Sequence, residues 1–210
     1  MGIREERRED LRKRLIEAAL ARIEAGGLRG LRAREITADA GCALGALYQA
    51  FQDLDDLVLH VNSLTLARMD ACLREAATSA PGARAILKAL AAAYLAFARE
   101  NRNLWAALFE HRMPDGVPVP EWHLREHAVL IHHIVGPLAM LQPSLDMQEL
   151  AVRARTLFSA VHGIVAVSIE ERFVGLVPAA VDLELERFLE VLVDGVERSR
   201  PVDDKTTGRD

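Results

Sequence analysis

One group of side chains in this sequence has the types and spacing of a metal site. His123-Leu-Arg-Glu126-His127 matches the H-x-x-E-H pattern of a class of zinc peptidases. Histidines four residues apart face the same side of a helix and can share a zinc ion. Five residues are a short pattern, however, and His132 and His133 only add to the local density. We therefore expect a partly exposed helix with scattered histidines, no catalytic residue and no metal, with a metal sensor and a metallohydrolase as alternatives.

A second group lies in "ITADAGCALGALYQAF", residues 36–51, which is typical of two short helices joined by a tight turn at Gly41. In a helix-turn-helix the second helix enters the major groove and its N-terminal residues meet base edges. Small apolar side chains can contact thymine methyls, a glutamine can pair with adenine, and an arginine can pair with guanine. The candidate DNA contacts are Arg32, Arg34, Ala43, Leu44, Gly45, Ala46, Tyr48 and Gln49.

A third group consists of large side chains in the rest of the chain. Its members are Leu66, Met69, Tyr94, Phe97, Trp105, Phe109, Trp122, Phe158 and His162. Most of them are expected to belong to a hydrophobic core. His162 lies in an apolar run, where a buried imidazole needs a hydrogen-bond partner.

The elements that must position these groups are all predicted to be helices. Apolar residues recur at helical spacing along most of the chain, and no segment is typical of a strand. Gly26-Gly27 should end the first helix, Asp53 should cap the fourth, and Gly136-Pro137 should kink or end the seventh. We expect about nine helices, at 5–25, 33–40, 43–50, 53–77, 83–100, around 105–109, 121–135, 146–173 and 179–199.

Composition and charge agree with an all-α protein. Half of the 210 residues are hydrophobic, and the net charge is −5. The charge is uneven, because residues 1–52 carry +2 and the remainder carries −7, which allows a DNA-facing end. The start of the chain lacks the apolar segment of a signal peptide, and the apolar run at 157–169 is too short to span a bilayer. We expect a cytoplasmic protein with Cys42 and Cys72 reduced.

The segment from residue 31 to residue 61 resembles the DNA-binding domain of the TetR family of regulators. The matching positions are Leu31, Ile36, Ala40, Gly41, Gly45, Leu47, Tyr48, Phe51 and Leu57. Residues 93–113 and 157–173 resemble the ligand-binding body of the WHG type, with Val161 in place of the tryptophan.

The resemblance implies a DNA reader that has lost several backbone contacts. The family commonly has Ser or Thr where this chain has Ala43, His where it has Ala50, and Lys where it has Leu54. Phosphate contacts supply much of the affinity for DNA and its dependence on salt. Tyr48 should still reach a phosphate. The remaining candidates for phosphate contact form the Arg-rich start, Arg4, Arg7, Arg8, Arg12, Lys13 and Arg14.

The resemblance also implies a small-molecule pocket in the body and a homodimer. The large residues of the third group become the candidate ligand contacts, for a small and largely apolar effector. The last two helices carry apolar stripes that the family would bury in a four-helix interface. These stripes are Ala154, Leu157, Phe158, Val161, Val165 and Ile169, then Leu185, Phe188, Leu189, Leu192 and Val196. Their polar faces are acid-rich, which disfavours anionic membranes.

Together these patterns predict a helix-turn-helix DNA-binding domain at 1–53, a ligand-binding and dimerisation domain at 54–200, and a disordered tail at 201–210. The predicted protein is a homodimeric regulator, a repressor that leaves operator DNA when its effector binds. It needs no cofactor and is not an enzyme. The alternative is an all-α small-molecule or metal-binding protein with weakened DNA binding.

Overall fold

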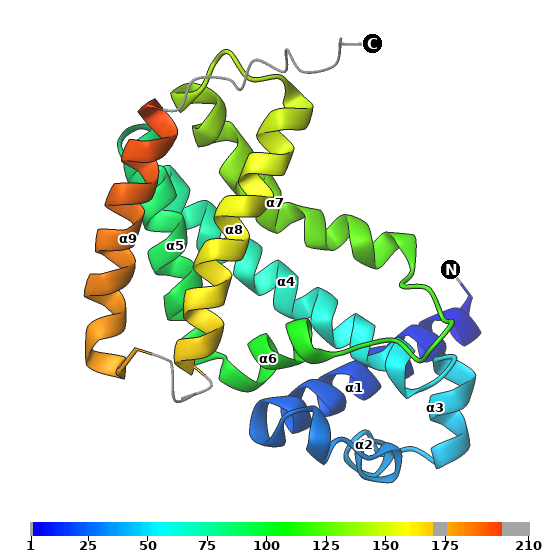
Figure 1. Ribbon diagram of the computed structural model, residues 1–210. Helices are drawn as coiled ribbons and strands as arrows, with labels where there is room; N and C mark the ends of the chain where they lie inside the picture. The colour runs from blue at the N-terminus through cyan, green and yellow to red at the C-terminus, as the bar shows by residue number, and fades with distance from the viewer. Residues whose placement is uncertain (1, 170–175, 199–210) are drawn as a thin grey trace, which may run out of the picture. The chain divides into compact units, whose positions relative to one another are not determined.

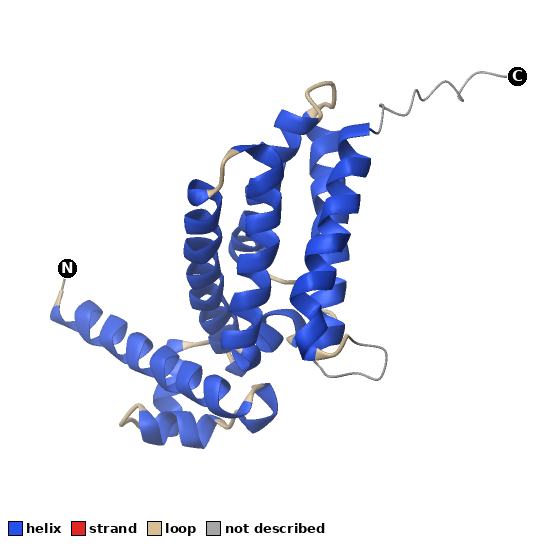
Figure 2. Cartoon of the chain, turned by 90° about the vertical axis from the view of Figure 1, so that its left-hand side faces the viewer, coloured by secondary structure: helices blue, strands red, loops and turns tan. Residues whose placement is uncertain are grey.

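Every regular element is a helix over the residues that the structure describes, 2–169 and 176–198 (Figure 2). This confirms the all-α prediction. The predicted tail at 201–210, and the predicted helical residues 170–173 and 199, lie outside the described residues. The computed structural model contains, in chain order (Figure 1), α1 Ile3–Gly26, the 3-10 turn η1 Leu28–Gly30, α2 Ala33–Asp39, α3 Leu44–Ala50, α4 Leu54–Ser79, α5 Gly82–Glu100, α6 Arg102–Glu110, α7 Glu121–Leu141, α8 Met147–Ile169 and α9 Pro178–Arg198.

Two predicted helix boundaries have the expected local chemistry. Gly27 adopts φ +65°, and its N–H donates to the carbonyl of Ile23 at 2.8 Å, which ends α1. The Asp53 carboxylate accepts a hydrogen bond from the backbone N–H of Asp56 at 2.8 Å, which caps the start of α4. Both boundary predictions are confirmed.

α7 does not end at Gly136-Pro137, as the sequence allowed, but continues through the proline to Leu141. A proline has no N–H for the carbonyl four residues earlier, which weakens the helix there. Leu138 is fully buried, and Leu141 packs against the same cluster. Apolar packing of the last turn therefore holds the helix beyond the proline.

The chain divides into two compact units, which we call the N-terminal unit and the C-terminal unit. The N-terminal unit contains residues 1–72 and 96–128, and the C-terminal unit contains residues 73–95 and the chain from 129 onward. The division falls inside α4, α5 and α7, so each of these helices contributes residues to both units.

The core of the N-terminal unit is built mainly from α1, α2, α3 and the first half of α4. Ile36, Leu47 and Phe51 of the helix-turn-helix pack in one cluster with Leu57 of α4 and Leu104 of α6. α1 contacts α2, α3 and α6, so one long helix supports the whole unit (Figure 1). The N-terminal unit is thus larger than the predicted DNA-binding domain at 1–53. The boundary of the DNA-binding domain at residue 53 stays a prediction.

The C-terminal unit packs α8 against α9 and joins α5 to α9 by ion pairs. Arg84 of α5 lies 2.6 Å from Asp194 and 2.7 Å from Glu197, and Lys88 pairs with Glu190. Among the described helices, α8 alone has the length and composition of a membrane span, and 28% of its apolar 18-residue stretch is buried. A core helix of a soluble protein can have the same length and composition. Ala154 of α8 is fully buried in the core.

Candidate functional site

The turn between α2 and α3 has the geometry of a helix-turn-helix. Gly41 adopts φ +65°, a conformation in which a residue with a side chain is strained. The N–H of Cys42 donates to the carbonyl of Thr37 at 2.9 Å and closes the turn. From α1, the Arg14 guanidinium donates to the carbonyl of Ala40 at 2.5 Å. The last turn of α2 is therefore held by a neighbouring helix as well as by its own backbone.

The predicted DNA-contacting residues lie mostly on the outer face of this motif. Seven of the eight are exposed, Arg32, Arg34, Ala43, Leu44, Gly45, Tyr48 and Gln49, whereas Ala46 is half-buried. Leu44 is 37% exposed and Tyr48 is 53% exposed, which is high for such large side chains. This outer face of α3 offers Tyr48 and Gln49 as polar groups and is otherwise apolar.

Charges around α2 are arranged so that its acidic side chains are neutralised. Arg22 of α1 pairs with Glu35 and, at 2.5 Å, with Asp39. The hydrogen bond from Arg22 lowers the pKa of Asp39. Arg34 stays exposed on the same helix, whereas Arg32 donates at 2.9 Å to the carbonyls of Arg29 and Leu31. The surface beside α3 is therefore not dominated by free carboxylates.

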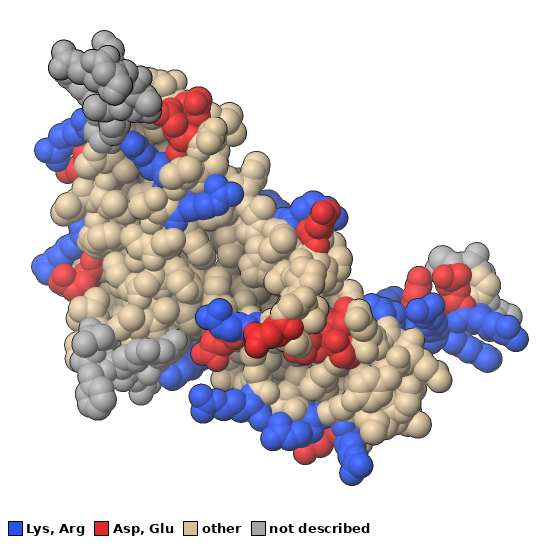
Figure 3. All heavy atoms as spheres, turned by 45° about the vertical axis from the view of Figure 1, so that its right-hand side comes forward, with Lys and Arg blue, Asp and Glu red and all other residues tan. Residues whose placement is uncertain are grey.

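Two arginines of the Arg-rich start, Arg12 and Arg14, make hydrogen bonds within the protein. Figure 3 shows Lys and Arg side chains, with some acidic ones, on the exposed first turns of α1. The side chain of Arg12 donates to the carbonyl of Ala50 and lies with its guanidinium 4.2 Å from the Phe51 ring. Like Arg14, it donates to a carbonyl at the end of a helix, where carbonyls lack partners within the helix.

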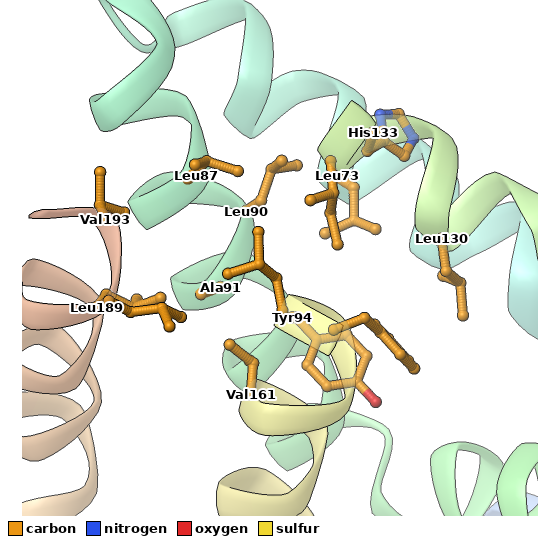
Figure 4. Close-up of a pocket in the computed structure, with 14 residues that line it drawn as sticks. Leu73, Leu87, Leu90, Ala91, Tyr94, Leu130, His133, Val161, Leu189 and Val193 are labelled. Atoms are coloured by element: carbon orange, nitrogen blue, oxygen red, sulfur yellow. The ribbon is translucent and has the colours of Figure 1, made fainter. Parts of the chain in front are cut away.

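A narrow pocket lies within the C-terminal unit, with a cavity of about 50 Å³. In Figure 4, Leu90 and Tyr94 of α5, Val161 of α8 and Leu189 of α9 converge on it. The fourteen lining residues are Leu73, Leu87, Leu90, Ala91, Tyr94, Leu130, His133, Ile134, Leu157, Phe158, Val161, Leu189, Leu192 and Val193. None of these described residues is Lys, Arg, Asp or Glu. The pocket therefore suits an uncharged, largely apolar molecule.

Tyr94 provides the main polar contact at the pocket wall. It is 4% exposed, and its hydroxyl lies 2.7 Å from Nδ1 of His162. The Phe158 ring stacks on His162 at 5.6 Å between centroids and meets Tyr94 edge-on at 5.7 Å. His162 thus has the hydrogen-bond partner that its apolar surroundings require, and it orients the tyrosine.

Comparisons with known proteins agree with this arrangement. The model of a family described as "Tetracyclin repressor-like, C-terminal domain" matches residues 87–194, about half of the chain. The chain belongs to the TetR family. Members of this family are transcriptional regulators, so the chain is a TetR-family transcriptional regulator.

Solved structures of similar proteins share the TetR fold over most of their length. A protein with unknown function from Rhodococcus sp. RHA1 is 24% identical, with a TM-score of 0.72 over 88% of this chain and 94% of that one. A TetR-family transcriptional regulator from Streptomyces coelicolor is 20% identical, with a TM-score of 0.64 over 90% and 97%. The transcriptional regulator FadR from Bacillus subtilis, solved in complex with stearoyl-CoA, is 14% identical, with a TM-score of 0.64 over 89% and 97%.

The structure of this TetR regulator brings together only part of the predicted ligand set. Tyr94 and Phe158 line the pocket, and His162 is hydrogen-bonded to Tyr94. The other six belong to the N-terminal unit and do not line this pocket: Leu66, Met69, Phe97, Trp105, Phe109 and Trp122. We therefore leave these six out of the proposed ligand site.

Sequence reasoning missed most of the aliphatic lining of the pocket. The predicted set consists mainly of aromatic residues, whereas half of the fourteen lining residues are leucines. A signal was present in α5, where Leu87, Leu90, Ala91 and Tyr94 recur at the spacing of one helix face. His133 was noted in the sequence only as part of a histidine-rich stretch.

The His-x-x-Glu-His motif lies in the N-terminal unit, where His123 is buried, His127 is half-buried and the three residues between them are exposed. His123 is 3% exposed, and its Nε2 lies 3.1 Å from Nε2 of His127. Burial and, to a smaller extent, the neighbouring His127 lower the pKa of His123 to about 4. Within the described part of the chain, no group of three or more His, Cys, Asp or Glu residues could hold a metal ion.

Most of the apolar residues assigned to the dimer interface are buried within a single chain. Ala154, Val165, Leu185 and Leu189 are all at most 5% exposed. Phe188 and Leu192 are half-buried beside a surface groove, and on the outer face of α9 Val191 is 73% exposed. A dimer through α8 and α9 stays a prediction.

Proposed function

We propose that this TetR regulator is a homodimeric, cytoplasmic repressor that reads operator DNA with α3 and releases it when an uncharged, apolar molecule fills the pocket. The observation that carries the proposal is the combination of an exposed helix-turn-helix and a pocket in the body. Neither feature alone requires regulation by a ligand.

The solvent-exposed side chains of α3 support its role in reading DNA. Tyr48 and Gln49 are exposed polar groups suited to a phosphate and to an adenine edge. Ala43 and Leu44, also exposed, can contact thymine methyls. Recognition should therefore favour A·T pairs in the major groove. The contacts to the DNA phosphate backbone should be fewer than those that the family commonly makes.

The ligand class follows from the pocket wall. An ionised carboxylate or phosphate needs a cation or several donors when it leaves water. The described lining supplies Tyr94, already hydrogen-bonded to His162, and the imidazole of His133. We therefore propose a neutral ligand with an alkyl or ring body and one hydrogen-bonding group.

Two helices connect the pocket to the DNA-reading end along the chain. α4 begins at the Asp53 cap next to α3 and contributes Leu73 to the pocket. α7 contributes Leu130 and His133 to the pocket, and its first turn belongs to the N-terminal unit. A ligand that prefers another arrangement of these helices would shift the population away from the DNA-binding form.

The function is tested by selecting duplex DNA from a random-sequence pool with the purified protein. We expect one palindromic sequence with half-sites separated by about one helical turn, 34–36 Å. Failure to enrich any sequence would favour the alternative, a small-molecule or metal-binding protein with weakened DNA binding. Enrichment that is unchanged in a Tyr48→Ala, Gln49→Ala double variant would show that α3 is not the reader.

The ligand class is tested separately with 1-decanol and decanoate, which share a ten-carbon chain but differ in charge. The alcohol should raise the melting temperature and the carboxylate should raise it less. A stronger effect of decanoate would contradict a neutral ligand.

A further inference from the structure

Arg12 of α1 reaches the C-terminal end of the DNA-reading helix. Its guanidinium donates to the backbone carbonyl of Ala50, the last residue of α3, and lies 4.2 Å from the centre of the Phe51 ring. Its second terminal nitrogen lies 2.8 Å from Nε2 of His60 in α4. A single side chain therefore contacts both α3 and α4.

Apart from the apolar packing of Leu47, Ala50 and Phe51, few contacts hold the ends of α3. The helix has only seven residues, Ala43 precedes it without a side-chain cap, and no basic residue lies in its last turn. Helices this short do not form in isolation, and their last carbonyls need partners. Arg12 supplies both a hydrogen-bond donor and a positive charge at the end where the helix dipole is negative.

His60 in turn joins Arg12 to the first turn of α7. An arginine can only donate, so Nε2 of His60 must accept, which requires the neutral imidazole. The imidazole stacks on Trp122, with 5.0 Å between ring centroids and 13° between planes. It also meets the edge of the Phe51 ring at 5.5 Å. The contacts therefore run from α7 through α4 and α1 to α3.

We propose that Arg12 is a positioning residue for α3, and that Trp122 at the start of α7 controls it through His60. Because α7 also contributes Leu130 and His133 to the pocket, this chain of contacts is a route by which a ligand changes α3. Trp122, which the sequence placed in the ligand site, would then act on DNA binding rather than on the ligand. The inference rests on the proposed role of α3 as the DNA reader.

The first experiment compares Arg12→Gln with Lys13→Gln, the matched loss of one positive charge at the next, exposed position of α1. Hydrogen exchange of the α3 amides is measured without DNA. Loss of one charged hydrogen bond should speed exchange about tenfold in Arg12→Gln and leave it unchanged in Lys13→Gln. Arg12→Lys, which keeps the charge but cannot bridge two acceptors, should resemble Arg12→Gln. Unchanged exchange in both Arg12 variants would overturn the proposal.

Binding to the duplex selected by the unaltered protein gives a second readout. A direct phosphate contact predicts a salt slope smaller by about 0.9 and rescue by lysine. Positioning predicts weaker binding with an unchanged slope and no rescue by lysine. If no duplex is selected, the function proposal fails, and the exchange experiment still decides whether Arg12 holds α3.

The role of Trp122 is tested by a double-mutant cycle. Trp122→Ala should speed exchange in α3, Trp122→Phe should largely preserve it by keeping a stacked ring, and Leu124→Ala, at an exposed neighbour, should have no effect. If Trp122 acts through Arg12, its effect disappears in the Arg12→Gln background. Additive effects of the two substitutions would overturn the route through His60.

Discussion

At the scale of single residues, the departures from the family pattern lie where DNA phosphates would be contacted. Leu54 begins α4, is partly buried, and packs against the core of the N-terminal unit. A lysine at this position can keep its aliphatic stem on the core and place its charge in water. Packing therefore does not require a leucine at position 54. Compared with the lysine of the family pattern, Leu54 lacks one positive charge that could contact a DNA phosphate.

Leu54→Lys should tighten binding to all DNA sequences alike. One added phosphate contact should steepen the dependence of log affinity on log salt by about 0.9. Titrations at several salt concentrations measure this, with Leu64→Lys, an exposed position farther along α4, as the control. A change in which sequence is preferred would argue that position 54 reads bases.

His123 gives a prediction about pH. Its pKa is lowered to about 4, mainly by burial, and its Nδ1 is buried without a hydrogen-bond partner in the protein. The unfolded chain binds a proton near pH 6.5, the ordinary value, whereas the folded chain does not bind it until about pH 4. The contribution of His123 to stability is therefore present above pH 6.5 and is lost as the pH falls through this window.

Melting temperatures of the unaltered protein and of His123→Gln should therefore converge as the pH falls from 7 to 5. Titrating groups that lie away from His123 are common to both proteins and cancel in the difference, which reports His123 together with its neighbour His127. His132→Gln, at an exposed position of the same helix, serves as the control for the loss of an imidazole. A constant difference in melting temperature between His123→Gln and the unaltered protein would show that the burial of His123 has no effect on its protonation.

At the scale of elements, helical periodicity predicted the number of helices and most of their ends, because caps and glycine turns are local features. Helical periodicity was insufficient where tertiary packing determines the end of a helix or the partner of an apolar face. Pro137 did not end α7, since the apolar residues after it find a core. The stripes of α8 and α9 were recognised, but a period of 3.6 residues cannot say whether an apolar face meets its own chain or a partner. Leu189 meets its own chain, and Val191 does not.

The outer face of α9 therefore carries the prediction about assembly. Val191 is 73% exposed and borders a surface groove with Phe188 and Gly195. In a twofold-symmetric interface each substitution occurs twice, and a glutamate buried without a partner is strongly unfavourable. Val191→Glu should give monomers in sedimentation, whereas Val117→Glu, at an exposed loop position, should not. If Val191→Glu forms dimers as stable as those of the unaltered protein, the interface does not include this face of α9.

At the scale of the whole molecule, the sequence predicted the family and the fold but only part of the pocket lining. Tyr94 and Phe158 line the pocket, and whether they contact a ligand stays a prediction. Trp105 and Phe109 contact each other in the N-terminal unit, with ring centroids 5.3 Å apart. Residue type alone could not separate these two environments, since α4, α5 and α7 each contribute to both units.

The last prediction joins the pocket to the response of the molecule. Ala91 lines the pocket, is 6% exposed, and has the smallest side chain of the lining. Ala91→Phe should fill the space that a ligand needs while leaving α3 untouched. A ligand acts only through its different affinities for the two forms, so a 100-fold loss of DNA affinity requires a preference of about 2.7 kcal/mol. With the pocket filled, 1-decanol should lose most of this preference, and its effect on DNA binding should nearly vanish.

Ala92→Phe, at the adjacent exposed position, should respond like the unaltered protein. We would measure affinity for the selected duplex with and without 1-decanol, and an undiminished response of Ala91→Phe would place the effector site outside this pocket.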